Sequence, residues 1–187
     1  MKKLIFILLL SFATHSHAFE IADVNLDEKI QLDKNQLVLN GAGIRKKFFV
    51  KVYIGALYLG EKARTADAVL ADNGVKRMSF ILLRSVTGKQ VLDGINEAIL
   101  PNNTDEEMKA IETRLYLFEK MFVPVTEIKN GEIVNLDYFP GVGTRVSVNG
   151  MDKGIIEGAD FYRSLLKIWV GKKPVQSALK QSVLGEE

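Results

Sequence analysis

Residues 46–59, KKFFVKVYIGALYL, carry the clearest structural pattern in the sequence, an alternation of side chains with a period of two. One set of alternate positions is entirely apolar or aromatic: Phe48, Val50, Val52, Ile54, Ala56 and Tyr58. The other set begins with Lys47, Phe49, Lys51 and Tyr53. Such alternation is typical of a strand that rests one face on a core. We therefore predict one long strand with an apolar face and a mixed face.

The chain on either side of this stretch also favours strands. A short apolar run at residues 36–40 ends at Gly41-Ala42-Gly43, which predicts a flexible turn before Ile44 and Arg45. Residues 75–84, VKRMSFILLR, predict a further strand. The first half of the chain is therefore expected to form most of a sheet.

The second half mixes helices with a hairpin. Apolar residues at helical spacing predict helices over 87–100 and from about 105 to 122, the latter opened by the capping-box pair Thr104 and Glu107. Strand patterns at 132–138, 144–148 and 154–158 surround Asn149-Gly150, a favoured hairpin turn. A helix is expected over 159–170 and a short final one from Pro174 to about Val183. This order predicts one α+β domain over residues 19–187, a largely antiparallel sheet with helices on one side.

Residues 1–18 have the pattern of a cleaved export signal. Lys2 and Lys3 precede an apolar run, and Ser16-His17-Ala18 matches the small-x-small site of signal peptidase. The apolar run is shorter than the roughly 20 residues that a membrane-spanning helix needs. We predict a periplasmic or secreted protein with no integral membrane segment after cleavage.

Removal of this segment decides which chemistry the chain can perform. Without Lys2 and Lys3 the 25 basic residues become 23, equal to the 23 acidic residues, so no overall positive charge is left to attract nucleic acid. His15 and His17 are the only histidines and the chain has no cysteine, so residues 19–187 contain neither. This excludes Ser-His-Asp and Cys-His nucleophile systems and metal sites built on those ligands. We predict no metal site and no cofactor.

Few residues qualify as a site from their spacing. Gly41-Ala42-Gly43 leads into a strand, whereas a phosphate-binding glycine loop leads into a helix. The carboxylates Asp105, Glu106 and Glu107 stand at a helix start, where they offset the helix dipole. Arg45, beside the predicted turn, suits a fixed guanidinium that faces a carboxylate or a developing oxyanion, or else a solvated surface arginine.

Two stretches together resemble the exported bacterial branch of the chalcone isomerase-like superfamily. They are NGAGIRKKFFVKVYIGALYL, residues 40–59, and PGVGTRVSVNGMDKGIIEGADFYRSLLKIWVGKKPVQSALKQSVLG, residues 140–185. The resemblance implies an open-faced β-sandwich, a large antiparallel sheet with a helical layer on one side and a hydrophobic cleft between them. It also implies that Arg45 matches the arginine that stabilises an oxyanion in the enzymes and holds a carboxylate in the fatty-acid-binding members.

The resemblance leaves three functions open. The first is a non-catalytic binding protein for a fatty acid or similar small amphiphile, with Arg45, Tyr53 and Tyr58 as ligand-binding residues. The second is an isomerase, an intramolecular lyase acting on a conjugated ketone, with Arg45 as its catalytic residue and Tyr53 or Tyr58 as hydroxyl donor. The enzymes carry a threonine after the arginine and a tyrosine on the following helix, whereas this chain has Lys51-Val52-Tyr53 and no tyrosine over 87–100, which favours binding. The third is an interaction module for an envelope protein, with the cleft collapsed and filled by side chains.

Overall fold

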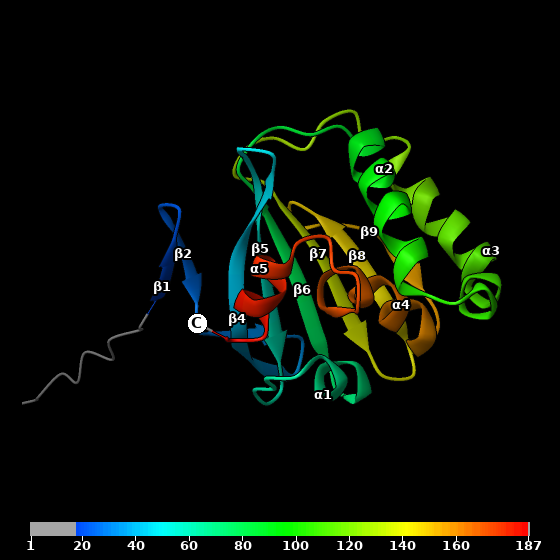
Figure 1. The fold of residues 1–187 in the computed structure, drawn as a ribbon, viewed down its shortest axis with the longest axis horizontal. Coiled ribbons are helices and arrows are strands. Elements are labelled where there is room, and N and C mark those ends of the chain that lie inside the picture. The colour runs from blue at the N-terminus through cyan, green and yellow to red at the C-terminus, as the bar shows by residue number, and fades with distance from the viewer. Residues whose placement is uncertain (1–17, 187) are drawn as a thin grey trace, which may run out of the picture.

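A seven-stranded antiparallel sheet forms the centre of the molecule in a computed structural model that describes residues 18–186 (Figure 1). Its strands follow one another in chain order as a meander, and a separate two-stranded hairpin precedes them. The hairpin is β1 (Ala18–Ile21) and β2 (Val24–Asp27). The sheet contains β3 (Lys29–Leu32), β4 (Asn35–Lys47), β5 (Val50–Leu59), β6 (Lys76–Leu82), β7 (Ile133–Phe139), β8 (Gly143–Val148) and β9 (Met151–Ile156).

Helices pack on one face of this sheet, which confirms the predicted α+β fold (Figure 1). They are α1 (Ala66–Ala71), α2 (Gly88–Ile99), the single 3₁₀ turn η1 (Leu100–Asn102), α3 (Asp105–Phe122), α4 (Ala159–Val170) and α5 (Ser177–Val183). The main core lies between these helices and the sheet, and contains Phe80, Phe118, Phe161 and Trp169. The apolar stripe of α4 supplies more of the helical side of that core than any other helix.

The local signals that contain a specific hydrogen-bonding group predicted their elements well. The predicted capping box of Thr104 and Glu107 begins α3, and a second one that was not predicted, Thr87 with Gln90, begins α2. Asn149-Gly150 joins β8 to β9 with positive φ at both residues. Helices α2 and α3 and strand β8 lie within one residue of their predicted bounds, whereas β9 begins at Met151, three residues before the predicted start at 154.

The single long strand predicted over residues 46–59 is wrong. The chain reverses at Phe48-Phe49, and Lys47 pairs with Val50 across a two-residue loop between β4 and β5. Residues 46–51 contain none of the Gly, Asn, Asp or Pro residues that mark such loops. A two-residue loop shifts the alternation by one position, because Lys47 and Val50 project from the same face, but the mixture of lysine and phenylalanine at residues 46–49 does not show that shift.

The turn predicted at Gly41-Ala42-Gly43 is also wrong, because these residues lie inside β4. Their glycines make room for α5, which crosses directly over the strand. A Cβ at Gly43 would lie 2.6 Å from the Cβ of Ser182, and one at Gly41 would collide with the Ser182 carbonyl oxygen. Glycine in a strand here marks the close approach of another segment.

The opposite face of the sheet carries a second, smaller apolar cluster. It includes Leu37, Leu39, Ile54 and Tyr58, together with Leu26 from β2. The sequence analysis did not predict β1, β2, β3 or α1. All but the last residue of the predicted export segment lies outside the described residues. None of the helices within 18–186 is both long and apolar enough to cross a membrane.

Candidate functional site

Arg45 lies near the end of β4, directly opposite Tyr53 of β5. Residues opposite one another on neighbouring antiparallel strands project from the same face. Tyr53 packs against the main core, so this is the face that the helices cover. Arg45 is half-buried there, and its guanidinium is held by the C-terminal part of the chain.

The guanidinium of Arg45 is bound to neutral oxygens. Its Nη1 donates to the side-chain Oε1 of Gln176 at 3.3 Å and to the backbone carbonyl of Lys46. The same Gln176 oxygen accepts from the backbone N–H of Lys46 at 2.8 Å. Gln176 thus joins the end of β4 to the start of α5.

No carboxylate within residues 18–186 pairs with Arg45, in contrast to several other arginines. Arg77 is paired with Asp137, and Arg114 with Asp160. A guanidinium forms its strongest hydrogen bonds with carboxylates and other anions. Arg45 is therefore a half-buried cation that can exchange a neutral partner for an acidic ligand.

Tyr53 connects this cation to an aromatic cluster. Its hydroxyl accepts a hydrogen bond from Trp169 Nε1 at 2.9 Å, and its ring meets the edge of Phe80 at a centroid distance of 5.2 Å. Phe80 in turn packs on Trp169 at 4.7 Å. Burial raises the pKa of Tyr53 to about 12, although the Trp169 hydrogen bond and the charge of Arg45 oppose that rise. The hydroxyl is therefore protonated at neutral pH, and its proton is available for donation.

Tyr58, the other tyrosine named from the sequence, lies apart from Arg45. It pairs with Leu39 and belongs to the apolar cluster on the opposite face of the sheet. Burial raises its pKa to about 12, and the nearby charge of Asp27 acts in the same direction. The structure thus brings Arg45 and Tyr53 together and leaves Tyr58 on the far side.

A bulge in β4 and helix α5 complete the surroundings of Arg45. The bulge at Asn40 aims that side chain at the C-terminal segment, where it donates to the carbonyl of Val183 at 2.7 Å. Leu179 of α5 lies 3.1 Å from where a Cβ of Gly43 would stand. The sequence analysis missed Gln176, Asn40 and Leu179, since their partners are more than 100 residues away along the chain.

The hydrophobic cleft that the family resemblance implied is closed in this structure. Of the two best-formed hollows among residues 18–186, the better enclosed has a volume of about 10 Å³, and the wider one, about 310 Å³, is open and lies on α3. A pocket for a drug-sized ligand is usually at least about 300 Å³ and mostly enclosed. Neither hollow touches Arg45. Apolar side chains fill the space between sheet and helices.

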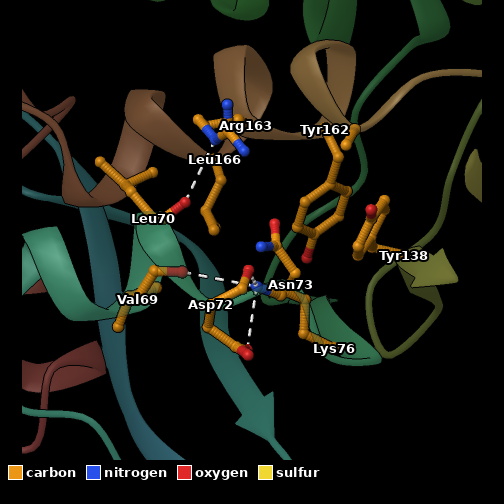
Figure 2. A pocket seen from close by; sticks show the side chains of 10 residues that line it. Val69, Leu70, Asp72, Asn73, Lys76, Tyr138, Tyr162, Arg163 and Leu166 are labelled. Atoms are coloured by element: carbon orange, nitrogen blue, oxygen red, sulfur yellow. Dashed lines mark hydrogen bonds and ion pairs between the residues drawn. The ribbon is translucent and has the colours of Figure 1, made fainter. Parts of the chain in front are cut away.

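The small hollow has both polar and apolar side chains in its wall and lies at the other end of the sheet, between α1 and α4 (Figure 2). Lys76 donates there to Asp72 and to the backbone of Val69, and burial lowers its pKa. The buried hydroxyl of Tyr162 has no hydrogen-bond partner. The volume suits a single water molecule rather than an organic ligand.

Groups of acidic side chains that could hold a metal ion are also absent from residues 18–186. Because residues 18–186 contain no histidine and no cysteine, the side chains that can bind a ligand here are charged, hydroxyl, amide and aromatic ones.

Comparison with known proteins gives a family match and a solved structure of similar fold. Residues 18–185 match the model of a family described as chalcone isomerase-like. A crystal structure of a fatty-acid-binding protein from Arabidopsis thaliana is similar in fold, with a TM-score of 0.64 and 16% sequence identity over 87% of this chain and 92% of that one. None of the curated proteins matches the sequence.

Proposed function

Since the chain belongs to the chalcone isomerase-like family, we propose that it binds a fatty acid or a similar small amphiphile and does not transform it. Arg45 would hold the acidic head, and the apolar side chains between sheet and helices would surround the tail. The observation that carries this proposal is the half-buried Arg45, bound to neutral oxygens beside an aromatic cluster. The fatty-acid-binding protein of similar fold supports it. Binding would take place outside the cytoplasm, after removal of residues 1–18.

The closed cleft implies that binding is coupled to a movement of α5. This helix is short and lies over β4, and Gln176 at its start occupies the guanidinium of Arg45. A carboxylate that displaces Gln176 would free that end of α5 from the sheet. The apolar contacts of Leu179 would then be exchanged for contacts with the ligand tail.

The energies are sufficient for binding at micromolar concentration. A buried acyl chain contributes roughly 0.8 kcal/mol per methylene. Association and the ordering of both partners offset much of that gain. The hydrogen bonds between a guanidinium and a carboxylate add about 1.5–3 kcal/mol when the pair is removed from water.

Replacement of Arg45 tests the proposal directly. Arg45→Ala should weaken binding of a long-chain fatty acid by about 1.5–3 kcal/mol, which is roughly 10- to 150-fold in Kd by isothermal titration. The matched control is Arg84→Ala, because Arg84 is an exposed arginine in the loop after β6. Equal affinity in Arg45→Ala and Arg84→Ala would remove Arg45 from the binding site.

One observation favours a second candidate, the isomerase. A protonated Tyr53 hydroxyl beside a fixed cation is an arrangement that polarises a ketone and stabilises an enolate. Turnover of a chalcone by the purified protein, lost in both Arg45→Ala and Tyr53→Phe, would support catalysis. Absence of turnover, together with tight binding of a fatty acid, would exclude the isomerase and leave binding as the function.

A further inference from the structure

The loop between β4 and β5 presents two aromatic side chains to solvent. Phe48 is 89% exposed and Phe49 is 99% exposed, and the adjoining Val50 is 47% exposed. Figure 1 shows this hairpin as a narrow ribbon at the edge of the fold, away from α4. Exposure of two neighbouring phenylalanines to this extent costs free energy in water, and contiguous exposed apolar groups mark interaction sites.

Positive charge surrounds these two side chains. Lys46, Lys47 and Lys51 are all exposed and flank the loop on both strands. The sequence has no Asp or Glu between residues 35 and 60. The acidic group that meets the loop is Glu97 of α2, at 3.9 Å from Lys47, in a pair that is largely exposed on both sides. Arg84, also exposed, follows β6 at the same end of the sheet.

The backbone of the loop holds an aromatic residue where glycine is usual. Phe48 has a φ of +56° at the first central position of the two-residue loop. Left-handed backbone is unfavourable for a bulky residue, and glycine is common at this position of hairpins. Because Phe48 packs on nothing that explains its presence, this strain points to a use of its exposed side chain.

We propose that this hairpin tip, residues 46–51, docks the protein on the surface of an anionic lipid bilayer. The rings of Phe48 and Phe49 enter the boundary between headgroups and acyl chains, where aromatic side chains are favoured. The three lysines reach the phosphates, with their aliphatic stems along the apolar boundary. The tip has only two central residues, which suits a penetrable lipid surface better than the broad flat contact of a protein interface.

This inference concerns a surface separate from the proposed ligand site and does not depend on ligand binding. Arg45 lies one residue before the tip on β4. If the proposed function is also correct, an amphiphile that leaves the bilayer at the tip meets the cation at the base of the same hairpin.

Vesicle sedimentation of residues 19–187 tests the proposal. The probe is a set of vesicles of phosphatidylcholine with about one third phosphatidylglycerol, compared with vesicles of phosphatidylcholine alone. The test variant is Phe48→Gly with Phe49→Ser, and the matched control is Val142→Ser. Val142 is a 49% exposed apolar residue in the β7–β8 turn, at the other end of the sheet.

The expected result is binding to the anionic vesicles that falls about tenfold or more in the double variant and is unchanged in the control. The double variant should unfold at the same temperature as the parent or a higher one, because glycine relieves the backbone at position 48 and the side chain of Phe49 is 99% exposed, so lost binding cannot come from unfolding. Replacement of the three lysines by glutamine should remove the preference for phosphatidylglycerol. Absence of vesicle binding, or binding that the two phenylalanines do not affect, would overturn the proposal. A dimer that Phe48→Gly disperses, without vesicle binding, would assign the tip to a second copy of the chain instead.

Discussion

At the scale of single residues, the exchange of partners by Arg45 is the event on which the proposed function depends. Gln176 Oε1 lies 3.3 Å from Arg45 Nη1, where one oxygen of a bound carboxylate would also lie. A neutral amide binds the cation in the unliganded protein, but less strongly than a carboxylate would. The closed state is therefore stable, and a carboxylate ligand can still displace Gln176 from Arg45.

Removal of that competing amide gives a prediction of opposite sign to Arg45→Ala. Gln176→Ala should leave affinity for a fatty acid unchanged or raise it by a few-fold, because one hydrogen bond no longer has to be broken. Isothermal titration measures the change, and Gln181→Ala, at an exposed position of α5, is the control. A loss of affinity as large as that of Arg45→Ala would make Gln176 a ligand-holding residue instead.

Tyr53 gives a prediction about alkaline pH. Its pKa is about 12 in the folded protein and about 10 when unfolded, so the folded state holds its proton more tightly. The stabilisation is therefore complete below pH 10 and is lost as the pH rises from about 10 to about 12. Between about pH 9 and about pH 11, Tyr53→Phe should lose about 1 kcal/mol less of its unfolding free energy than the parent. Equal losses in both proteins, by denaturant unfolding at the two pH values, would contradict the assigned burial.

At the scale of elements, α5 depends on the absence of side chains from β4. A Cβ on Gly41 would overlap the Ser182 carbonyl, and one on Gly43 would press on the Ser182 side chain. Gly41→Ala should therefore lower the unfolding free energy by about 1–3 kcal/mol, the usual effect of overpacking. Gly60→Ala is the control, because a Cβ there has nothing within 4 Å. If both variants unfold at the same denaturant concentration, α5 does not pack as described.

The contrast between elements shows what the sequence could predict. The capping pairs at Thr87 and Thr104 and the turn Asn149-Gly150 identify themselves locally, since the groups that form each hydrogen bond lie within four residues. The glycines of β4 are needed because Ser182, almost 140 positions later, packs against them. That contact cannot be seen in the local sequence, where two glycines suggest a turn. Arg45 was identified through a family resemblance, whereas Gln176, which holds it, carries no local signal.

At the scale of the whole molecule, charges on the outer face of the sheet tie distant strands together. Asp137 of β7 is 1% exposed and accepts two hydrogen bonds from Arg77 of β6, at 2.6 and 2.7 Å. Arg145 of β8 reaches both Asp137 and Asp33, which lies in the turn between β3 and β4. The sheet is therefore curled enough for the turn between β3 and β4 to approach β8.

Loss of the Asp137 carboxylate, which both Arg77 and Arg145 contact, should destabilise this curled sheet. Asp137→Asn leaves Arg77 without its buried counter-charge, and should lower the unfolding free energy by about 2–4 kcal/mol. Asp93→Asn, in the exposed pair with Lys89, should change it by less than about 1 kcal/mol. Chemical denaturation of the two variants beside the parent makes the comparison. Equal small effects would show that the network adds nothing to the curl of the sheet.

Two ends of one hairpin have different properties at this scale. The tip carries exposed phenylalanines and lysines, and the base carries Arg45 beside the aromatic cluster. If both proposals are correct, the β4–β5 hairpin is the path by which an amphiphile passes between a membrane and the interior of the protein.

The most direct test of the central claim is native mass spectrometry of the protein purified from its native host. We expect a mass adduct that denaturing analysis identifies as a fatty acid or related acidic amphiphile, present in the parent and in Arg84→Ala and lost in Arg45→Ala. An unliganded parent protein under mild conditions, or an adduct that persists in Arg45→Ala, would contradict the claim that Arg45 anchors an amphiphile in this fold.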